Sequence, residues 1–400
     1  MDHTCSGVTV VPVTIITGFL GSGKTTLLNH ILKDKSHGMK FAIIENEYGD
    51  VSVDDTVITE QPQDEVIEVM NGCLCCTVRG DLVKVLKRLY RRMSQFDGII
   101  IETTGMADPA PVCQTFFVEE HMKRLFRLDA VITVVDSKNI IERLNEEKPA
   151  DAVNESEAQI AFADKVLLNK VDLSSEDELV KIEERIKSIN PNCSITRCKD
   201  GNVNPQDLIN IQAFDVRRAL DLDEDFLDEF SEPTQHDSTI GSIAVKLEGS
   251  VNMAMLETWI QRLLGEDGAK LYRYKGIISV KGMPLKFIFQ GVGMNFDGGF
   301  CDIEWGEDER RESRFVFIGK NLDDKLYRDG FIACKADTPL RFEVGDMVEC
   351  QIDEAYVVGK ILMQWEEGNA YRIEVQNADR SNVWAPVDID AYVRTVKSPR

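Results

Sequence analysis

The sequence predicts an α/β fold: a doubly wound parallel sheet, followed by a small α+β domain and a small C-terminal β domain. Three observations predict it. Apolar, β-branched runs end repeatedly in Gly, Asp or Asn, as strands buried on both faces do. Stretches with apolar residues at helical spacing separate these runs, and such alternation is typical of parallel sheets. The pattern then changes near residue 220, and near residue 339 the predicted strands become short.

Alternating strands and helices occupy the first half of the chain. The predicted strands are "VTVVPVTIITG", "KFAIIENE", "DGIIIETTG", "LDAVITVVDS" and "ADKVLLNKVDL". The predicted helices are "TTLLNHILKD", "DLVKVLKRLYRRMSQ" and "SEDELVKIEERIKSI". In a sheet of this kind, ligands bind at the carboxyl ends of the strands. We therefore expect the functional residues to follow the strands, within a domain that spans residues 1–219.

An acidic linker is predicted at residues 220–238. Six acids lie between Asp221 and Phe230 without a positive charge, which favours a solvated connection over a metal-storage tail. Residues 239–335 follow as an α+β domain with a sheet on one side and helices on the other. Its predicted strands are "GSIAVKLEG", "LYRYKGIISVK", "LKFIFQGVG" and "SRFVFIGKNL", and its helices are "NMAMLETWIQRLLG" and "DDKLYRDGFIAC".

The last 65 residues, 336–400, contain short strands separated by turn-like segments. This spacing predicts a small, five-stranded, SH3-like β-barrel. Its aromatic residues are expected in the core and at the rim, with a cage for a ligand as the alternative: Phe342, Tyr356, Trp365, Tyr371 and Trp384.

Composition excludes several classes of function. A net charge of −23 argues against a nucleic-acid partner, because phosphates would be repelled over most of the surface. No run approaches the roughly 18 apolar residues of a membrane helix. The opening residues lack the basic segment of a signal peptide, so we expect a cytoplasmic protein with reduced thiols and no membrane partner.

A phosphate-binding loop is the strongest motif, and it predicts the P-loop NTPase version of the doubly wound sheet. The segment "GFLGSGKT" at residues 18–25 satisfies G-x-x-x-x-G-K-[ST] between a predicted strand and a predicted helix. Backbone N–H groups of such a loop wrap the phosphates, and the helix N-terminus adds its dipole. Lys24 is expected to reach the β- and γ-phosphates, and the Thr25 hydroxyl to coordinate Mg²⁺. The predicted nucleotide contacts here are Gly18, Gly21, Ser22, Gly23, Lys24, Thr25 and Thr26.

The segment "NKVD", at the end of a predicted strand, indicates which base is bound. Asp172 can accept two parallel hydrogen bonds from the N1–H and N2 amine of guanine, whereas adenine offers no such pair. Lys170 can lay its alkyl stem over the purine, and Asn169 can bond the base edge or nearby backbone. The motif therefore predicts GTP rather than ATP.

Glu102 ends the predicted strand "GIIIETTG" and is the second predicted catalytic residue beside Lys24. Its carboxylate can hold a Mg²⁺-bound water or orient the attacking water, and Gly105 can approach the γ-phosphate through its backbone. The alternative role for Glu102 is a helix N-cap. Asp136, which ends "VITVVD", is expected to be structural or to position a loop.

Three of the ten cysteines lie together in "NGCLCC", at Cys73, Cys75 and Cys76. The segment falls among the ligand-side connections of the sheet, near the acids of "IENEYGD": Glu45, Glu47 and Asp50. Thiolates with a carboxylate or histidine make a tetrahedral site that suits zinc, although cobalt, nickel or copper could also bind. Redox chemistry and inert thiols are the alternatives. The other seven cysteines are expected to be buried and inert. The scattered histidines are expected to be structural.

Together these motifs resemble the CobW-like metallochaperone GTPases, the group that includes YjiA-type members and the zinc-regulated metalloprotein activators. The matching residues are "TGFLGSGKTTLLNHIL", "IENEYGDVSVDD", "NGCLCC", "IETTGMADPAPVCQTFF", "NKVD", "LYRYKGI", "FQGV" and "VFIGKNLD", in this order over residues 12–330. The resemblance implies a GTPase that loads zinc or a related ion into a client metalloprotein. It also implies that Cys73, Cys75 and Cys76 bind the metal, and that Glu45 and Asp50 couple metal to nucleotide.

The chain departs from the resemblance at two places. The family often has a histidine after "QGV" and a histidine-rich loop, whereas here Gly293 follows Val292 and the linker is acidic. A C-terminal metal site and a high-capacity metal store are therefore not expected. Residues 339–400 lie outside the resemblance. A kinase, a cobalt-handling factor in cobalamin synthesis and a nucleotide-regulated scaffold are the competing interpretations, and a homodimer is compatible with all of them.

Overall fold

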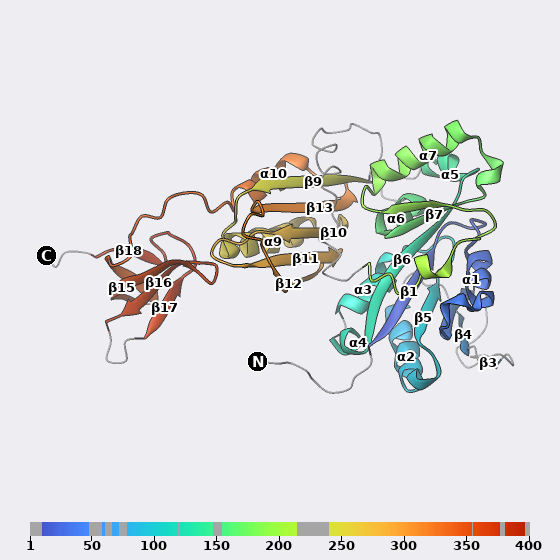
Figure 1. Cartoon of the computed structure of the whole chain (residues 1–400), viewed down its shortest axis with the longest axis horizontal. Coiled ribbons are helices and arrows are strands. Elements are labelled where there is room, and N and C mark those ends of the chain that lie inside the picture. Colours follow the sequence, from blue (N-terminus) through green and yellow to red (C-terminus); the bar gives the residue numbers. More distant parts are fainter. Residues whose placement is uncertain are drawn as a thin grey trace.

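Three sheets follow one another along the chain in the computed structural model, which describes residues 10–47, 58–60, 66–71, 78–118, 120–146, 154–213, 240–353, 355–376 and 381–396. They form three units in a row, with the third unit at the far end from the first (Figure 1). The doubly wound sheet comes first and an antiparallel sheet with helices second, as predicted. No helix within the described ranges is long and apolar enough to cross a membrane.

The first sheet has eight strands in the order β3-β4-β2-β5-β1-β6-β7-β8. Neighbours are parallel except for β3, which runs antiparallel to β4 at the edge. Strand β1 lies between β5 and β6, so the phosphate loop that follows it lies in the middle of the carboxyl edge. The bounds are β1 (Val11–Thr17), β2 (Phe41–Glu47), β3 (Ile58–Glu60), β4 (Val66–Asn71), β5 (Gly98–Glu102), β6 (Phe126–Asp136), β7 (Lys165–Asn169) and β8 (Ser194–Arg197).

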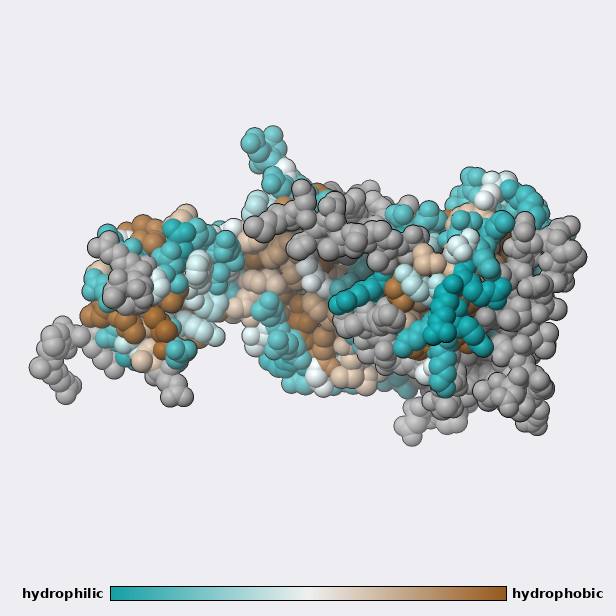
Figure 2. Space-filling view, turned by 90° about the horizontal axis from the view of Figure 1, so that it is seen from below, coloured by the Kyte–Doolittle hydropathy of each residue, from teal (hydrophilic) through white to brown (hydrophobic). Residues whose placement is uncertain are grey.

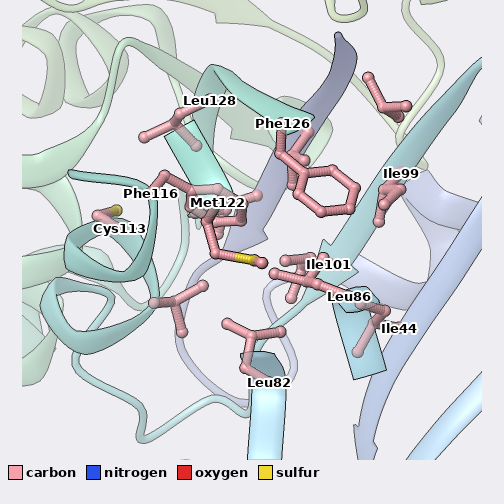
Figure 3. Close-up of a cluster of buried hydrophobic side chains, with 14 of the residues drawn as sticks. Ile44, Leu82, Leu86, Ile99, Ile101, Cys113, Phe116, Met122, Phe126 and Leu128 are labelled. Atoms are coloured by element: carbon pink, nitrogen blue, oxygen red, sulfur yellow. The ribbon is translucent and has the colours of Figure 1, made fainter. Parts of the chain in front are cut away.

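Helices cover both faces of this sheet, because successive strand residues face opposite sides. Ile99 and Ile101 of β5 belong to one core cluster, and Ile100 between them belongs to another. Figure 3 shows the first cluster, where side chains of the strands meet those of α2, α3 and α4. The helices are α1 (Lys24–Lys33), α2 (Val78–Tyr90), α3 (Ala110–Val118), α4 (Glu120–Leu125), α5 (Ile140–Leu144), α6 (Glu155–Phe162) and α7 (Glu176–Ile189).

The second sheet is antiparallel, in the order β12-β11-β10-β13-β9. One face packs against both helices around an aromatic core in which Trp259, Phe315 and Phe331 lie within ring contact. The bounds are β9 (Ile240–Glu248), α9 (Met253–Asp267), β10 (Leu271–Ile278), β11 (Leu285–Val292), β12 (Asn295–Glu304), β13 (Glu312–Lys320) and α10 (Asp324–Ile332).

The other face of the second sheet packs on the first unit at one end. Ala244 and Ile318 share a core cluster with Ile160 of α6, so the two units have a common apolar interface. Arg273 of β10 forms a buried ion pair with Asp164 and donates a 3.1 Å hydrogen bond from Nη1 to the Phe162 carbonyl. A charged pair in such an interface specifies one register for the contact.

The third sheet has the order β17-β16-β15-β14-β18 and is antiparallel throughout. Five strands were predicted for this segment, and the SH3-like class stays a prediction. Asn252 at the start of α9 donates a 2.7 Å hydrogen bond to the Pro386 carbonyl and ties the third unit to the second. The bounds are β14 (Met347–Ile352), β15 (Ala355–Glu366), β16 (Asn369–Val375), β17 (Asn382–Ala385) and β18 (Val393–Thr395).

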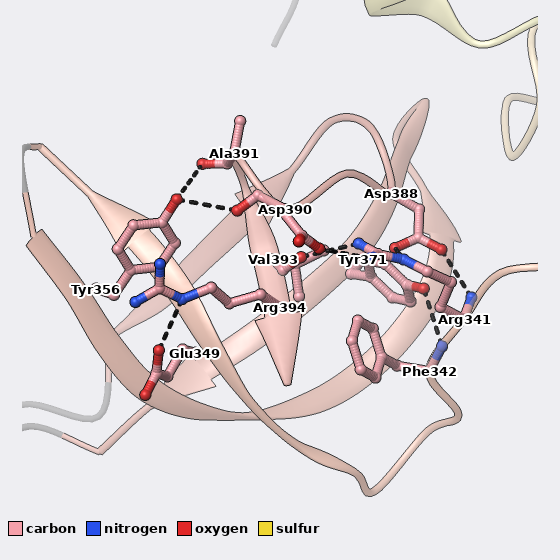
Figure 4. A network of polar contacts seen from close by, with 10 residues as sticks. All are labelled: Arg341, Phe342, Glu349, Tyr356, Tyr371, Asp388, Asp390, Ala391, Val393 and Arg394. Atoms are coloured by element: carbon pink, nitrogen blue, oxygen red, sulfur yellow. Dashed lines mark hydrogen bonds and ion pairs between the residues drawn. The ribbon is translucent and has the colours of Figure 1, made fainter. Parts of the chain in front are cut away.

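Arginines of the third unit lie on its own aromatic rings (Figure 4). The Arg394 guanidinium lies 3.4 Å from the Tyr356 ring centre and pairs with Glu349 at 2.8 Å. Arg341 lies 5.2 Å from the Phe342 ring centre and bonds Asp388 and Asp390. These internal cations occupy the ring faces that a ligand cage would need. Core and rim roles therefore describe Phe342 and Tyr356 better than a ligand cage does. Figure 2 shows further apolar surface on this unit.

Candidate nucleotide and metal site

Three glycines of the phosphate loop adopt backbone conformations that L side chains rarely adopt. Gly18, Gly21 and Gly23 have φ of 139°, 83° and 109°. A Cβ at Gly18 would lie 2.2 Å from the Val134 carbonyl oxygen, and a Cβ at Gly23 would lie 2.4 Å from Asn169 Nδ2. The first contact packs the loop against β6, and the second packs it against the end of β7. Glycine is therefore favoured by conformation at all three positions, and it is required by space at Gly18 and Gly23.

Lys24 begins α1 and folds back over the loop. Its Nζ donates to the carbonyl oxygens of Gly18 at 2.8 Å and Phe19 at 3.3 Å, and the side chain is buried. Burial lowers the pKa of Lys24, and the nearby Glu102 charge opposes this shift. Ser22 is fully buried, and its hydroxyl has no hydrogen-bond partner within the described residues. A phosphate oxygen is a suitable partner for both groups, since each can donate to it.

Thr25, in the first turn of α1, contacts Glu102 at the carboxyl end of β5. Thr25 Oγ1 donates a 2.8 Å hydrogen bond to Glu102 Oε1, while Glu102 Oε2 is buried without a partner in the described part of the chain. Burial raises the pKa of Glu102; the Thr25 bond and the Lys24 charge oppose this, and the charge of Glu45 adds to it. A hydroxyl beside a carboxylate oxygen fits Mg²⁺, which prefers oxygen ligands.

The predicted guanine residues lie against the phosphate loop. Asn169 Nδ2 donates to the Ser22 carbonyl at 3.0 Å, and Lys170 Nζ donates to the Gly21 carbonyl at 2.8 Å. Asp172 follows in a 3-10 turn and is partly exposed. The end of β7 and the phosphate loop therefore form one site, although Ser22 and Asn169 are 147 positions apart in the sequence.

Asp136, at the end of β6, fixes the position of Lys170. Its Oδ2 accepts from Lys170 Nζ and from Asn139 Nδ2, both at 2.8 Å, and its Oδ1 accepts from the Lys138 amide at 2.9 Å. Burial raises the pKa of Asp136, but these hydrogen bonds and the Lys170 charge outweigh it and hold the pKa below its usual value. The loop-positioning role expected for Asp136 fits this geometry.

Sequence reasoning missed the loop after β8. The Gly201 amide donates to Asn169 Oδ1 at 3.2 Å, the Cys198 thiol lies 3.6 Å from the same oxygen, and Lys199 pairs with Asp172 at 3.2 Å. Cys198 is buried, as expected for the scattered cysteines, but it also contacts Asn169 of the predicted base-binding segment. The signal was present: "CKDGN" follows a short β-rich stretch, where the next strand of a parallel sheet should end.

Gln159 of α6 was also missed, and it holds the segment after β5. Its Nε2 donates to the Gly105 carbonyl at 3.1 Å and to the Ala107 carbonyl at 3.3 Å. A Cβ at Gly105 would lie 2.4 Å from the Leu20 amide nitrogen. Gly105 therefore packs directly on the backbone of the phosphate loop, which is where a γ-phosphate sensor has to lie.

Most of the predicted metal site lies outside the described residues: Cys73, Cys75, Cys76 and Asp50. The strands that lead into it are described. In the parallel pair β2–β4, Glu47 lies opposite Asn71, and Glu45 lies opposite Val69. The ends of β2 and β4, which precede Asp50 and the cysteines in the sequence, therefore lie side by side at the carboxyl edge. Within the described ranges, no three His, Cys, Asp or Glu side chains form a group that could hold a metal ion.

The remaining cysteines and histidines have structural surroundings. Cys113, Cys193, Cys198, Cys301, Cys334 and Cys350 are buried as free thiols, while Cys5 lies outside the described residues. His30 Nε2 lies 2.9 Å from the Val203 carbonyl oxygen, and His37 Nε2 lies 3.0 Å from that of Ile31. Their expected structural roles agree with these contacts.

Comparison with known proteins supports this architecture. Residues 12–197 match the family described as the CobW/HypB/UreG nucleotide-binding domain, and residues 240–335 match the cobalamin synthesis protein CobW C-terminal domain. The solved structure of the zinc-bound YjiA GTPase from Escherichia coli superposes with a TM-score of 0.66 at 33% identity, covering 82% of this chain and all of that one.

Curated relatives agree along most of the chain. The zinc chaperone YjiA of Escherichia coli is 37% identical over 325 residues, which are 80% of this chain and 98% of the relative. The zinc chaperone CobW of Pseudomonas aeruginosa is 34% identical over 349 residues, 78% of this chain and 88% of the relative. The zinc-regulated GTPase metalloprotein activator 1 of Schizosaccharomyces pombe is 33% identical over 331 residues, 74% and 78%. The two matched domains, and relatives that are 33–37% identical along most of the chain, together mean that this chain belongs to the CobW/HypB/UreG family.

Proposed function

We propose that this chain is a GTP-hydrolysing zinc chaperone that converts GTP and water to GDP and phosphate and delivers zinc to a client metalloprotein. Three relatives with names of this kind match most of its length. The names describe those proteins. In this chain, each predicted site residue has a role in phosphate binding, base selection, metal binding or coupling.

The phosphates are bound by the loop at residues 18–25 and by Lys24, whose ammonium balances the charge that develops on them. Ser22 supplies a buried hydroxyl without another partner in the described chain, and Thr26 follows in the first turn of α1. Thr25 is the residue that would hold Mg²⁺, which when bound would neutralise charge on the phosphates. Glu102, at the end of β5, would hold a Mg²⁺-bound water or orient the attacking water.

Guanine is selected by Asp172. Its carboxylate accepts from the two donors of the guanine edge, and Lys170 covers the ring while held by Asp136 and Gly21. The Asn169 side chain donates from its amide nitrogen to the Ser22 carbonyl and accepts at its oxygen from the Gly201 amide, so it fixes the base segment to the phosphate loop. The site thereby joins recognition of the base to recognition of the phosphates.

Zinc is the cargo in this proposal. Cys73, Cys75 and Cys76 offer thiolates and Glu45 and Asp50 offer carboxylates, and four of these donors would complete a tetrahedral Zn²⁺ site. Thiolates form when the metal displaces their protons, so binding depends on pH and on reduced cysteines. Cytoplasmic location and a client metalloprotein partner belong to the same proposal.

The register of β2 with its two neighbouring strands supports a coupling between metal binding and nucleotide binding. Glu45 lies opposite Val69 of β4 on one side and opposite Glu102 of β5 on the other. A ligand that pulls on the end of β2 therefore acts on the strand next to Glu102. If zinc binds better in the GTP-bound arrangement, GTP must also bind better in the presence of zinc, because coupling free energies are reciprocal.

A test uses the full chain, purified in reduced form. Zinc is titrated while GTP turnover and bound zinc are measured in parallel, for the wild type, Cys73→Ala and Cys75→Ala. The proposal expects near-stoichiometric zinc in the wild type, a zinc-dependent change in turnover or GTP affinity, and the loss of both in the variants.

Cys350→Ala is the matched control, since Cys350 is a buried thiol of the third unit. It should bind zinc and hydrolyse GTP as the wild type does. Equal turnover with and without zinc in every protein would leave a GTPase without coupled metal. Turnover no faster than the background rate under all conditions would instead contradict the GTPase.

A further inference from the structure

One half of the open face of the second sheet is not used in packing on the first unit. Strand residues alternate between the two faces, so Phe315 and Phe317 of β13 face the helices, while Arg314 and Val316 face the opposite way. At one end of that opposite face, Val316 and Ile318 pack against the first unit. At the other end, Arg314 lines a hollow of about 290 Å³.

The hollow carries an excess of positive charge. Its charged lining residues are four cations and two carboxylates: Lys246, Lys286, Arg310, Arg314, Glu309 and Glu312. Both carboxylates are engaged inside the hollow. Glu309 accepts from Lys286 Nζ at 2.6 Å, and Glu312 pairs with Arg314 and lies 3.9 Å from Lys246 Nζ. The lining residues sum to a formal charge of +2 in a chain whose net charge is −23, and Arg310 also pairs at 2.9 Å with Glu248, which is not itself a lining residue.

An apolar floor lies under these charges. Ile277 lines the hollow and packs with buried Ile288 and Cys301. Trp305 forms one side, with Lys286 Nζ at 4.7 Å from its ring centre and the Arg311 guanidinium at 5.4 Å on the same ring. The indole Nε1–H of Trp305 is buried and has no acceptor among the described residues. An acceptor on a bound molecule would satisfy it, because a buried donor without a partner costs free energy.

We propose that this hollow binds an acidic, extended segment of a protein partner, with one apolar side chain of that segment on the floor formed by Ile277 and Trp305. Charge complementarity favours carboxylates, since the cations outnumber the acids of the lining. The volume is at the lower end of ligand pockets, which suits one or two side chains rather than a folded surface. A polyphosphate backbone does not fit as well, because it has no apolar group to place on the floor formed by Ile277 and Trp305.

The position of the hollow gives this binding a use. It lies on the same sheet face as the interface with the first unit, so a bound segment would lie next to a surface that already packs on the GTP-binding domain. In a zinc chaperone the partner in question is the client, and this identification rests on the proposed function. The binding itself needs neither GTP nor zinc, so its test and the test of the chaperone activity can fail separately.

The test uses the full chain and a fluorescein-labelled peptide rich in glutamate with a single central phenylalanine, followed by fluorescence anisotropy without nucleotide or metal. Arg310→Glu reverses a lining cation whose side chain is 72% exposed, so the fold tolerates the change. Lys286→Gln removes the cation beside Trp305. Each variant should weaken binding by about fivefold or more, which is the effect of losing one or two charge contacts.

Lys325→Glu is the matched control, because Lys325 is an exposed cation on α10, on the covered side of the same sheet. It should bind the peptide as the wild type does. A peptide with lysine in place of glutamate should not bind, and one with alanine in place of phenylalanine should bind more weakly. A melting curve for each variant shows whether the protein is folded.

Three results would overturn the proposal. Equal loss in Lys325→Glu and Arg310→Glu would mean that net charge alone attracts the peptide. Inorganic phosphate that displaces the peptide at equal molar concentration would mean a site for a small anion. Binding that occurs only after the acids of residues 221–230 are replaced by amides would mean that the occupant is this segment of the chain itself.

Discussion

Thr25 Oγ1 donates a hydrogen bond of 2.8 Å to Glu102 Oε1, and this contact joins the first turn of α1 to the carboxyl end of β5. The two residues are 77 positions apart in the sequence. The contact places the hydroxyl assigned to the metal ion directly beside the carboxylate assigned to the attacking water. Each residue therefore influences the position of the other, and variants of Thr25 alone are needed to test the role of its hydroxyl in binding the metal ion.

Thr25→Val keeps the shape of the side chain but removes the hydroxyl, whereas Thr25→Ser keeps the hydroxyl. We expect Thr25→Val to lose the Mg²⁺-dependent part of its GTP affinity, and Thr25→Ser to retain most of it. Titration of MgCl₂ against a fluorescent GTP analogue measures this part directly. Equal magnesium dependence in the two variants would show that Thr25 does not hold the ion.

The glycines of the phosphate loop allow a sharper comparison. Gly21 and Gly23 both have positive φ, so alanine costs about 1 kcal/mol or more of conformational strain at either position. A Cβ at Gly21 meets no atom within 4 Å, but one at Gly23 would lie 2.4 Å from Asn169 Nδ2. Gly23→Ala should therefore weaken GTP binding at least about tenfold more than Gly21→Ala, as measured by isothermal titration calorimetry.

Asp172 offers a test of base recognition. Asp172→Asn replaces one acceptor oxygen by an amide donor, which suits the 2-oxo group of xanthine better than the 2-amino group of guanine. We expect the variant to lose GTP affinity by about 100-fold or more and to gain affinity for XTP. Competition between the two nucleotides for one fluorescent reporter measures the exchange. Unchanged preference for GTP would mean that Asp172 does not contact the base.

The motif residues were predictable because they are local signals with fixed spacing. The loop "GFLGSGKT" and the segment "NKVD" were each predicted from a few neighbouring residues, and the doubly wound sheet explains why the two segments meet. Asn252 and Ser175 illustrate the same principle in helix starts, since each caps its helix with its side chain.

Contacts that depend on tertiary structure were not predictable. Gln159 gives no local sign that it holds the Gly105 and Ala107 carbonyls. Strands β3, β4, β8 and β12 were not predicted, since they are short, mixed with acids or rich in glycine, as in "NFDGGFCDIE". The ion pair of Arg273 with Asp164 joins two units whose boundary alone was visible in the sequence.

Buried thiols provide a prediction about reactivity. Burial raises the pKa of Cys193 to about 12, and it raises the pKa of Cys198 and Cys334 to about 11. The raised pKa means that these thiols stay protonated at pH 8, so iodoacetamide should not modify them in the folded protein. Mass spectrometry of labelled peptides should find them modified only after unfolding. If "NGCLCC" binds zinc, its cysteines should be labelled in the metal-free protein and protected by zinc.

A buried ion pair lies in the contact between the two larger units. Arg273 and Asp164 have side-chain exposures of 11% and 6%, and Asp164 also accepts a 2.8 Å hydrogen bond from the Val131 amide. Arg273→Ala leaves this carboxylate buried without its cation, which should lower the free energy of unfolding by roughly 3 kcal/mol. Arg310→Ala is the control, since its pair with Glu248 is exposed and should be worth less than about 1 kcal/mol.

Asp164 follows α6, and α6 also carries Gln159, which holds Gly105 beside the phosphate loop. Without the Arg273 contact, nucleotide binding to the first unit should therefore no longer stabilise the second unit. A non-hydrolysable GTP analogue should raise the melting temperature of both units together in the wild type. In Arg273→Ala it should raise the melting temperature of the first unit only. Differential scanning calorimetry measures both shifts. A variant that still melts in one transition, and shifts as a whole with nucleotide, would show that the apolar contacts of Ala244 and Ile318 are sufficient to join the units.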